Sequence, residues 1–422
     1  MAVRLTLPTI QNWSCHNCGG CCRQHLIEVT EEERQRIIAQ NWTEADGIPA
    51  DRPVLVRLSG FGRKQRYRLG HQSDGACVFL DEKGLCRIHA KFGEHAKPLP
   101  CRIYPYAFHP GGKQAVVSLR FSCPSVVANL GRPVSEQLDD LKKMAAVVVP
   151  ESAKNVPPPP VSDHERLDWP DFSRFVTALD QTFAANDVSV TVKLMRALFW
   201  INVAGQSKFD VVRGERLGEF LDLMTTAASH EVAENLAPMD EPSRSGKLQF
   251  RLLAAQYARK DTFVSLESGL AGRWRLLRSA IRFARGTGNV PPLQEVFSSV
   301  PFSALEAPFG GISAEADEIL TRYFRVKIQG LHFCGPAYYD VPLVEGFQSL
   351  ALVFPSVLWL SRWLAASGGR SALTTDDVAR ALAIADHHHG YSPAFGQGHF
   401  RRRVRLLART RDIGRLCAWY AR

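Results

Sequence analysis

The chain has 422 residues, 45% of them hydrophobic and 22% charged, a composition typical of a globular protein with two or three domains. Its formal net charge of +10 fits an acidic or nucleic-acid partner, and it would equally offset an anionic cluster of thiolates. We find no run of about 18 apolar residues and no signal peptide at Met1, so we expect a cytoplasmic protein without a membrane span. We expect the most apolar stretch, Leu350–Leu360, to be a buried helix.

Cysteines are concentrated near the N-terminus, where eight of the ten lie within the first 123 residues. Four occur between Cys15 and Cys22, in the pattern C-x2-C-x2-C followed directly by another cysteine. This spacing is typical of three thiolates on one face of a cubane iron–sulfur cluster, and C-x2-C alone suits zinc. Free core cysteines do not cluster in this way, and disulfides need an oxidising compartment. Because adjacent side chains tend to point apart, we expect Cys21 and Cys22 to serve different sites or different atoms of one cluster.

The segments after this motif are predicted to form a small α+β domain. Thr30 and Glu33 have the spacing of a capping box, which predicts a helix from Glu31. Hydrophobic patterns predict strands at 54–58 and 65–69 about a turn at Gly60–Lys64, and hairpins of 77–80 with 85–88 and of 104–109 with 114–121. Cys77 and Cys86 would then stand near opposite ends of the first hairpin, and the second hairpin would lead to Cys123. We therefore expect the strands to carry ligands back to the first loop.

The remainder of the chain is predicted to be helical. A helix at about Ser135–Val149 precedes Pro157–Pro160, a stiff segment that is the best candidate for a domain boundary. Helical periodicity follows from Trp169 to Phe183 and from Trp274 to Ala284, and further helices are predicted at 190–204, 214–230, 314–331, 343–366, 374–388 and 399–420. We thus predict the α+β class, with a cysteine-rich metal-binding domain at 1–150, a proline-rich linker at 151–165 and a helical domain at 166–422.

The order of the cysteine motifs resembles the flagellin lysine N-methylase family. The resemblance is carried by C-x2-C-x2-C-C from Cys15, C-V-F-L from Cys77, C-x-I-x4-G-E-x6-C-x2-Y-P from Cys86, and S-L-x-F-S-C-P ending at Pro124. It is dense over residues 15–124 and faint over Ile319–Leu364. The family lies within a wider group of cysteine-cluster proteins described as zinc- or iron-chelating. One departure is His25, where an aromatic residue is expected nearby, and this affects substrate contacts in that loop more than the metal site.

The resemblance implies an enzyme that methylates lysine side chains of a protein such as flagellin, using S-adenosylmethionine and a cysteine-ligated metal centre. The implied ligands are the eight clustered cysteines: Cys15, Cys18, Cys21, Cys22, Cys77, Cys86, Cys101 and Cys123. They allow a [4Fe-4S] cluster or zinc, in one centre or two. The Gly-rich loop of a Rossmann-type donor site is absent from the sequence, so the donor either binds through the metal centre or is not used.

Several residues near the cysteines are candidates for chemistry. The candidates for the acid–base group are His89, Glu94, Tyr104 and His109. We favour Tyr104, against the alternative that it only packs under the cluster. Arg87 and Arg102 each follow a cluster cysteine and could compensate thiolate charge, clamp a substrate carboxylate, or simply face solvent. His387-His388-His389 cannot chelate one ion from one helix, so a helix end before Gly390 is the expected explanation, although a single histidine could enter a substrate pocket as a base.

The function predicted from the sequence is a metal-centre protein-lysine methylase with a protein substrate. A second hypothesis is a non-enzymatic zinc or iron–sulfur protein whose helical domain binds a partner. A third hypothesis is a zinc-stabilised nucleic-acid binder, motivated by the arginines between Arg401 and Arg415. The apolar face of that C-terminal segment and its lack of stacking aromatics make nucleic acid the less favoured partner.

Overall fold

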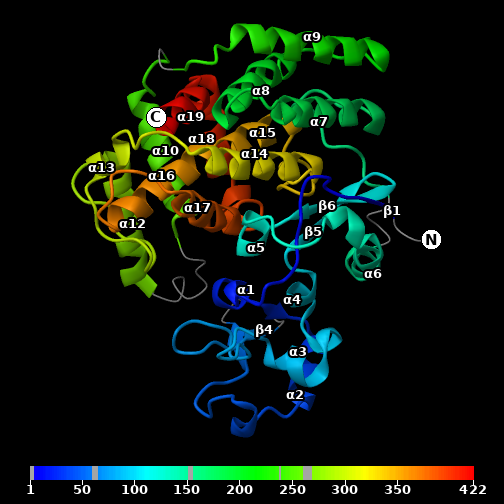
Figure 1. Ribbon diagram of the computed structural model, residues 1–422, viewed down its shortest axis with the longest axis vertical. Helices are drawn as coiled ribbons and strands as arrows, with labels where there is room; N and C mark the ends of the chain where they lie inside the picture. Colours follow the sequence, from blue (N-terminus) through cyan, green and yellow to red (C-terminus); the bar gives the residue numbers. More distant parts are fainter. Residues whose placement is uncertain (1–3, 59–64, 151–154, 237–238, 260–268) are drawn as a thin grey trace. The chain divides into compact units, whose positions relative to one another are not determined.

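The computed structural model describes residues 4–58, 65–150, 155–236, 239–259 and 269–422 (Figure 1). The chain forms two compact units, a cysteine-rich unit of Ser14–Ala107 and a helical unit of Met1–Trp13 with Phe108–Arg422. The predicted α+β class is confirmed, since all named strands among the described residues lie before residue 120 and a large helical part follows.

The cysteine-rich unit has a small antiparallel sheet with short helices around it. Its strand order is β2 (Glu28–Val29), β4 (Arg66–Leu69), β3 (Leu55–Leu58), so the predicted strand pair is confirmed, while its turn at 60–64 lies outside the described residues. The helices are α1 (Gly20–Gln24), α2 (Glu31–Ala39), α3 (Arg87–Phe92) and α4 (Leu99–Ile103), with 3-10 turns η1 (Glu44–Asp46) and η2 (Glu94–Ala96). The predicted capping box is present: Thr30 Oγ1 accepts from Glu33 N at 3.2 Å, and Glu33 Oε2 accepts from Thr30 N at 2.9 Å.

The hairpin predicted for residues 77–80 and 85–88 is wrong. Only an isolated bridge joins Leu80 to Cys86, and Cys86 is the N-cap of α3 rather than a strand residue. The reason lies in the backbone donors of the first segment, because Cys77 N donates to Cys22 O at 2.7 Å, a partner 55 residues away in the chain. The turn itself is where it was expected, with Asp81 Oδ1 accepting from Lys83 N and Leu85 N.

The helical unit begins with a second three-stranded sheet. Strand β1 (Arg4–Thr6) pairs in parallel with β6 (Gln114–Leu119), which neighbours β5 (Tyr106–Gly111). The predicted second hairpin is therefore confirmed, and Gly112 in its turn has a φ of 77° that favours glycine. Helix α5 (Pro124–Val127) follows Cys123, and η3 (Val134–Gln137) with α6 (Leu138–Val148) matches the helix predicted at Ser135–Val149.

The predicted helices of this unit are present, and two of them are divided. The elements are α7 (Trp169–Ala184), α8 (Val190–Ala204), α9 (Glu215–Glu231), α10 (Arg244–Tyr257), α12 (Gly269–Arg285), α13 (Phe302–Glu306), α14 (Ala314–Gln329), α15 (Leu343–Ala351), α16 (Val353–Ser367), α17 (Thr375–His388), η5 (Pro393–Gly396), α18 (Gly398–Arg409) and α19 (Asp412–Ala421). The single helices predicted at 343–366 and 399–420 are each two helices, the second because Arg411 adopts a φ of 57° between α18 and α19. Helices α10 and α13 were not predicted.

The core of the helical unit is built on α16, whose residues from Val353 to Ala365 are all buried. The segment Leu343–Ser367 has the length and composition to cross a membrane, yet 89% of its most apolar window is buried inside the protein, as in the core helix of a globular fold. The expectation of a buried helix at Leu350–Leu360 is thus confirmed. The proline run is tied to this core, since Pro160 O accepts from Leu343 N at 2.8 Å; the domain boundary placed there stays a prediction.

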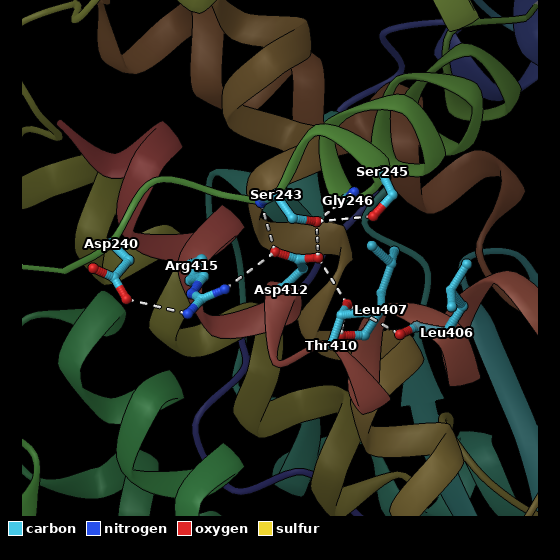
Figure 2. A network of polar contacts seen from close by, with 9 residues as sticks. All are labelled: Asp240, Ser243, Ser245, Gly246, Leu406, Leu407, Thr410, Asp412 and Arg415. Atoms are coloured by element: carbon cyan, nitrogen blue, oxygen red, sulfur yellow. Dashed lines mark hydrogen bonds and ion pairs between the residues drawn. The ribbon is translucent and has the colours of Figure 1, made fainter.

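Asp412 joins the N-terminus of α10 to α19 (Figure 2). Its fully buried carboxylate accepts from Ser243 N at 2.8 Å, from Ser243 Oγ at 2.6 Å and from Thr410 Oγ1 at 2.7 Å. Gly246 is required beside it, because a Cβ at this position would lie 2.5 Å from the carboxylate. The start of α10 is therefore fixed by a side chain that is distant in sequence.

Candidate metal centre and buried polar cluster

Four thiols of the cysteine-rich unit gather around one hydrophobic core, and a fifth, that of Cys21, lies beside one of them. Cys77 is a member of that core, and Cys22, Cys86 and Cys101 pack against it. Cys21 precedes Cys22 in α1, Cys86 caps α3, and Cys101 lies in α4, so short helices supply most of these side chains. The others of the eight are placed differently: Cys15 and Cys18 are exposed in the loop before α1, and Cys123 is the buried N-cap of α5 in the helical unit.

Cys21 and Cys22 point to the same side, contrary to the expectation that they would point apart. Their sulfur atoms lie 3.9 Å apart because both residues occupy the first turn of the short helix α1. Two thiolates bound tetrahedrally to zinc, with Zn–S near 2.3 Å, would have their sulfurs about 3.8 Å apart. The pair therefore has a spacing that suits two ligands of one metal atom.

The loop that precedes α1 packs tightly on the turn after Leu80. Gly19, the N-cap of α1, has a φ of 66°, and a Cβ there would lie 3.3 Å from the Leu80 side chain. At Gly84 a Cβ would lie 2.5 Å from Asn17 O, so only glycine permits this approach of the two backbones. These contacts bring the segment with Cys18 beside the turn that separates Cys77 from Cys86.

The thiols affect one another electrostatically. A hydrogen bond with Cys22 lowers the pKa of Cys21 to about 6, and the same bond together with burial raises the pKa of Cys22. Burial raises the pKa of Cys77 to about 12 and also raises the pKa of Cys101, with the charges of neighbouring cysteines adding to both shifts. These sulfurs are thus close enough for their charges to repel, which a bound cation would relieve. Within the described ranges, however, three or more His, Cys, Asp or Glu side chains are nowhere already arranged around a metal position.

The four other site residues predicted from the sequence have distinct surroundings. Tyr104 follows α4 and stacks edge-on against His25, with ring centres 4.8 Å apart. His89 is exposed on α3. The Arg87 guanidinium donates to Asp46 O at 3.2 Å and covers Gly47, while Arg102 lies half-buried on α4.

A buried polar cluster in the helical unit was not predicted. Lys327 of α14 and Asp386 of α17 are both fully buried, with Nζ 2.6 Å from Oδ1. Lys327 Nζ also donates to Leu119 O at 3.1 Å and lies 3.1 Å from His332 Nδ1, and Asp386 Oδ2 accepts from Ser122 N at 3.1 Å. The pair therefore ties two helices to the end of β6.

Histidines and tyrosines surround this ion pair. The His332 ring lies 4.6 Å from that of His109 and 5.0 Å from that of Tyr391, and His389 Nδ1 is hydrogen-bonded to Tyr257 OH at 2.9 Å. Burial, with the charge of Lys327, lowers the pKa of His109 to about 3 and keeps the pKa values of His332 and His389 well below normal. The Nε2 atoms of all three histidines are buried without a hydrogen-bond partner among the described residues. The cluster therefore contains neutral imidazoles with unused polar atoms.

The triple histidine lies at a helix end, and three of the C-terminal arginines form ion pairs within the protein. Helix α17 ends at His388 and Gly390 has a φ of 81°, which confirms the predicted helix end. Arg401 and Arg405 both donate to Glu345, each with a closest distance of 2.7 Å, and Arg415 pairs with Asp240 at 3.1 Å. Because these arginines are engaged within the protein, they give little support to the nucleic-acid hypothesis.

Comparison with known proteins finds a family model that matches the cysteine-rich part of the chain. Residues 14–124 match the CxxCxxCC family, described as a "Putative zinc- or iron-chelating domain". The lysine-N-methylase of Salmonella typhimurium and that of Salmonella choleraesuis are each 27% identical over 137 residues, which cover 30% of this chain and 32% of theirs. The flagellar biosynthetic protein FliU of Salmonella muenchen is 26% identical over 135 residues, 77% of its length. The match thus spans about a third of the two lysine-N-methylases, and no solved structure matches.

Proposed function

We propose that the cysteine-rich unit binds zinc or an iron–sulfur cluster and that the protein methylates lysine side chains of a protein substrate with S-adenosylmethionine. The observation that carries the metal centre is the convergence of four thiols on one core, with the sulfur of Cys21 at a distance from that of Cys22 that suits ligation of one metal atom. The ligands would come from the eight clustered cysteines, and the loop bearing Cys15 and Cys18 would complete the set when metal binds. Bound metal would supply positive charge and, in an iron–sulfur cluster, an iron atom open to substrate.

Two observations support the enzymatic part of the proposal. Two lysine-N-methylases are 27% identical to this chain over 137 residues. In addition, the helical unit buries a lysine, an aspartate and three histidines, and burial lowers the pKa values of the histidines. Groups with shifted pKa values concentrate at functional sites. A cytoplasmic setting and a flagellin-type substrate belong to the same proposal.

The chemistry requires a neutral amine. A lysine ammonium must first lose a proton; its nitrogen then forms a bond to the methyl carbon as the sulfonium C–S bond breaks and S-adenosylhomocysteine leaves. We assign proton removal to Tyr104 before His89, because Tyr104 adjoins the ligand-bearing helix α4 whereas His89 is exposed. Arg102 would contact a substrate carboxylate. Arg87, whose guanidinium donates to Asp46 O, would offset thiolate charge at longer range.

Metal analysis tests the first part of the proposal. Protein purified anaerobically is expected to contain stoichiometric zinc, or iron with acid-labile sulfide and broad absorption near about 400 nm. Cys22→Ser should lose the metal, whereas Cys417→Ser, a buried cysteine in the helical unit, should keep it. Equal metal content in both variants, or none in the wild type, would refute the metal centre.

Transfer of labelled methyl groups to flagellin, or to a lysate of the same cell, tests the second part. Tyr104→Phe should lose activity and keep its metal, while Tyr67→Phe, whose hydroxyl donates to Gln65 Oε1 at the surface, should keep both. Full activity in Tyr104→Phe removes this residue from the mechanism. A metal-loaded wild type that methylates nothing would favour the alternative, a non-enzymatic zinc or iron–sulfur protein whose helical unit binds a partner.

A further inference from the structure

Helix α12 presents apolar side chains to solvent. Trp274, Leu277 and Ile281 are 70%, 51% and 44% exposed, and their spacing of three and four residues places them in one stripe. Phe283, on the opposite side, is buried where α12 packs against α10. Since a helix of a globular protein normally buries its one apolar face, a second exposed stripe marks a surface that binds something.

The charge beside this stripe is of one sign. Four exposed arginines lie on the arc of α12 next to the stripe: Arg275, Arg278, Arg282 and Arg285. The sequence of α12 contains no Asp or Glu, so these charges have no compensation within the helix. The surface thus combines apolar contact area with strong positive charge.

A groove adjoins the stripe and shares Leu277 with it. The groove has a volume of about 340 Å³ and is mainly apolar, with Leu252, Ala255, Leu276 and Leu293 among its lining residues. Two of its polar atoms, Arg403 Nη1 and Gln256 Oε1, are buried and have no hydrogen-bond partner among the described residues. Buried polar groups are normally paired, so a donor and an acceptor left open here indicate that a ligand completes the site. Among the residues that the structure describes, the lining contains arginine and histidine and no Asp or Glu.

We propose that the groove between α10 and α12, together with the stripe of α12, binds an acidic amphipathic helix of a partner protein. Apolar side chains of such a helix would fill the groove and cover Leu277, and its flanking carboxylates would meet Arg403 and the arginines of α12. A flat bilayer surface would reach the stripe and not the two open atoms in the groove. A nucleic acid would use the arginines and leave the apolar stripe uncovered. The concave and polar parts of the surface therefore favour a protein partner.

Fluorescence anisotropy with the full-length protein tests this proposal. The probe is a labelled peptide of about 18 residues, since shorter helices are marginal in water, with leucines on one helical face and glutamates flanking them. The comparison peptides have the same composition with the leucines dispersed, or lysine in place of glutamate. We expect binding of the acidic amphipathic peptide only, weakened about tenfold or more by Leu277→Asp and by Arg403→Met. Leu223→Asp, which changes a leucine 62% exposed on α9, should not alter binding.

Several outcomes would overturn the proposal. They are no binding of the acidic amphipathic peptide, equal binding of the dispersed peptide, or an equal loss in Leu223→Asp. Anionic phosphatidylglycerol vesicles or single-stranded RNA that bind more tightly than the peptide, and lose binding in Leu277→Asp, would assign the surface to lipid or nucleic acid instead. Because Leu277 is exposed, Leu277→Asp should retain the far-ultraviolet circular dichroism of the wild type, which keeps the comparison interpretable.

Discussion

Replacing Lys327 with methionine should destabilise the helical unit strongly. Lys327 Nζ lies 2.6 Å from Asp386 Oδ1, and neither side chain contacts solvent. At an effective dielectric constant of about 20, the attraction at this distance is about 6 kcal/mol, part of which offsets the cost of burying both charges. Lys327→Met removes the attraction and leaves the Asp386 carboxylate buried, so that its desolvation is no longer offset by a partner of opposite charge. We expect a loss of about 3–5 kcal/mol in the free energy of unfolding, a large share of the roughly 5–15 kcal/mol typical of a folded protein.

A second substitution separates charge from packing. Asp386→Asn in the Lys327→Met background removes the uncompensated charge and keeps an acceptor for Ser122 N, so it should restore about 1–3 kcal/mol. The matched control is Arg380→Met, which breaks an exposed pair with Asp376 on the same helix α17 and should change stability by less than about 0.5 kcal/mol.

Hydrogen exchange of the α14 and α17 amides during denaturation by urea is the appropriate assay. A chain with two compact units need not unfold in one step, so a local measurement is needed. If Lys327→Met changed the stability of these helices no more than Arg380→Met does, the ion pair would not be buried as described. If Asp386→Asn gave no recovery, the loss in Lys327→Met would come from packing and not from charge.

Three other perturbations have defined outcomes. Chelation of the metal should unfold Ser14–Ala107 and leave the helices after Pro160 protected from hydrogen exchange; an unchanged protection pattern would contradict this. Gly246→Ala should cost about 1–3 kcal/mol in thermal unfolding, because its Cβ would meet the Asp412 carboxylate, whereas Gly398→Ala, which has open space, should be neutral. Burial opposes ionisation of Glu345, but its two arginine partners outweigh burial and lower its pKa, so its stabilising effect is present at neutral pH. Glu345→Gln should therefore be less stable than wild type at neutral pH, and the difference should vanish as the pH falls below 4.5 and through the lowered pKa.

Regular helices were predictable from the sequence because their apolar residues repeat at helical spacing. Helix α8 has the bounds predicted for it, and α7 spans the periodic residues from Trp169 to Phe183. Helix α10 was missed for a physical reason: Gly246 in its first turn lowers local helix propensity, and Asp412, distant in sequence, stabilises that turn. The strand predicted at Cys77 failed in the same way, because its backbone N–H bonds to Cys22 O. Long-range partners decided both cases.

The candidate site was predictable in part. The cysteines are visible in the sequence because their spacing itself identifies metal-binding chemistry. Lys327 and His332 give no such signal, since a lysine in an amphipathic helix is normally solvated, and only the packing of α14 against α17 shows that it is buried. The clues available were His109, an acid–base candidate whose ring lies 4.6 Å from that of His332, and the triple histidine, of which His389 enters a buried network through Tyr257.

The buried cluster bears on the choice between an enzyme and a carrier. A domain that only binds a partner needs a suitable surface, and the α10–α12 groove with its exposed stripe would supply one. A binding surface does not itself require the enclosure of Lys327, Asp386 and histidines with unused Nε2 atoms, and each buried charge costs several kcal/mol before its pairing offsets the cost. Burial and the charge of Lys327 lower the pKa values of these histidines, so they accept a proton weakly, and in our proposal proton removal stays with Tyr104. Because perturbed groups of this kind concentrate at functional sites, the cluster supports the enzyme that we propose, in which the groove would hold the protein partner.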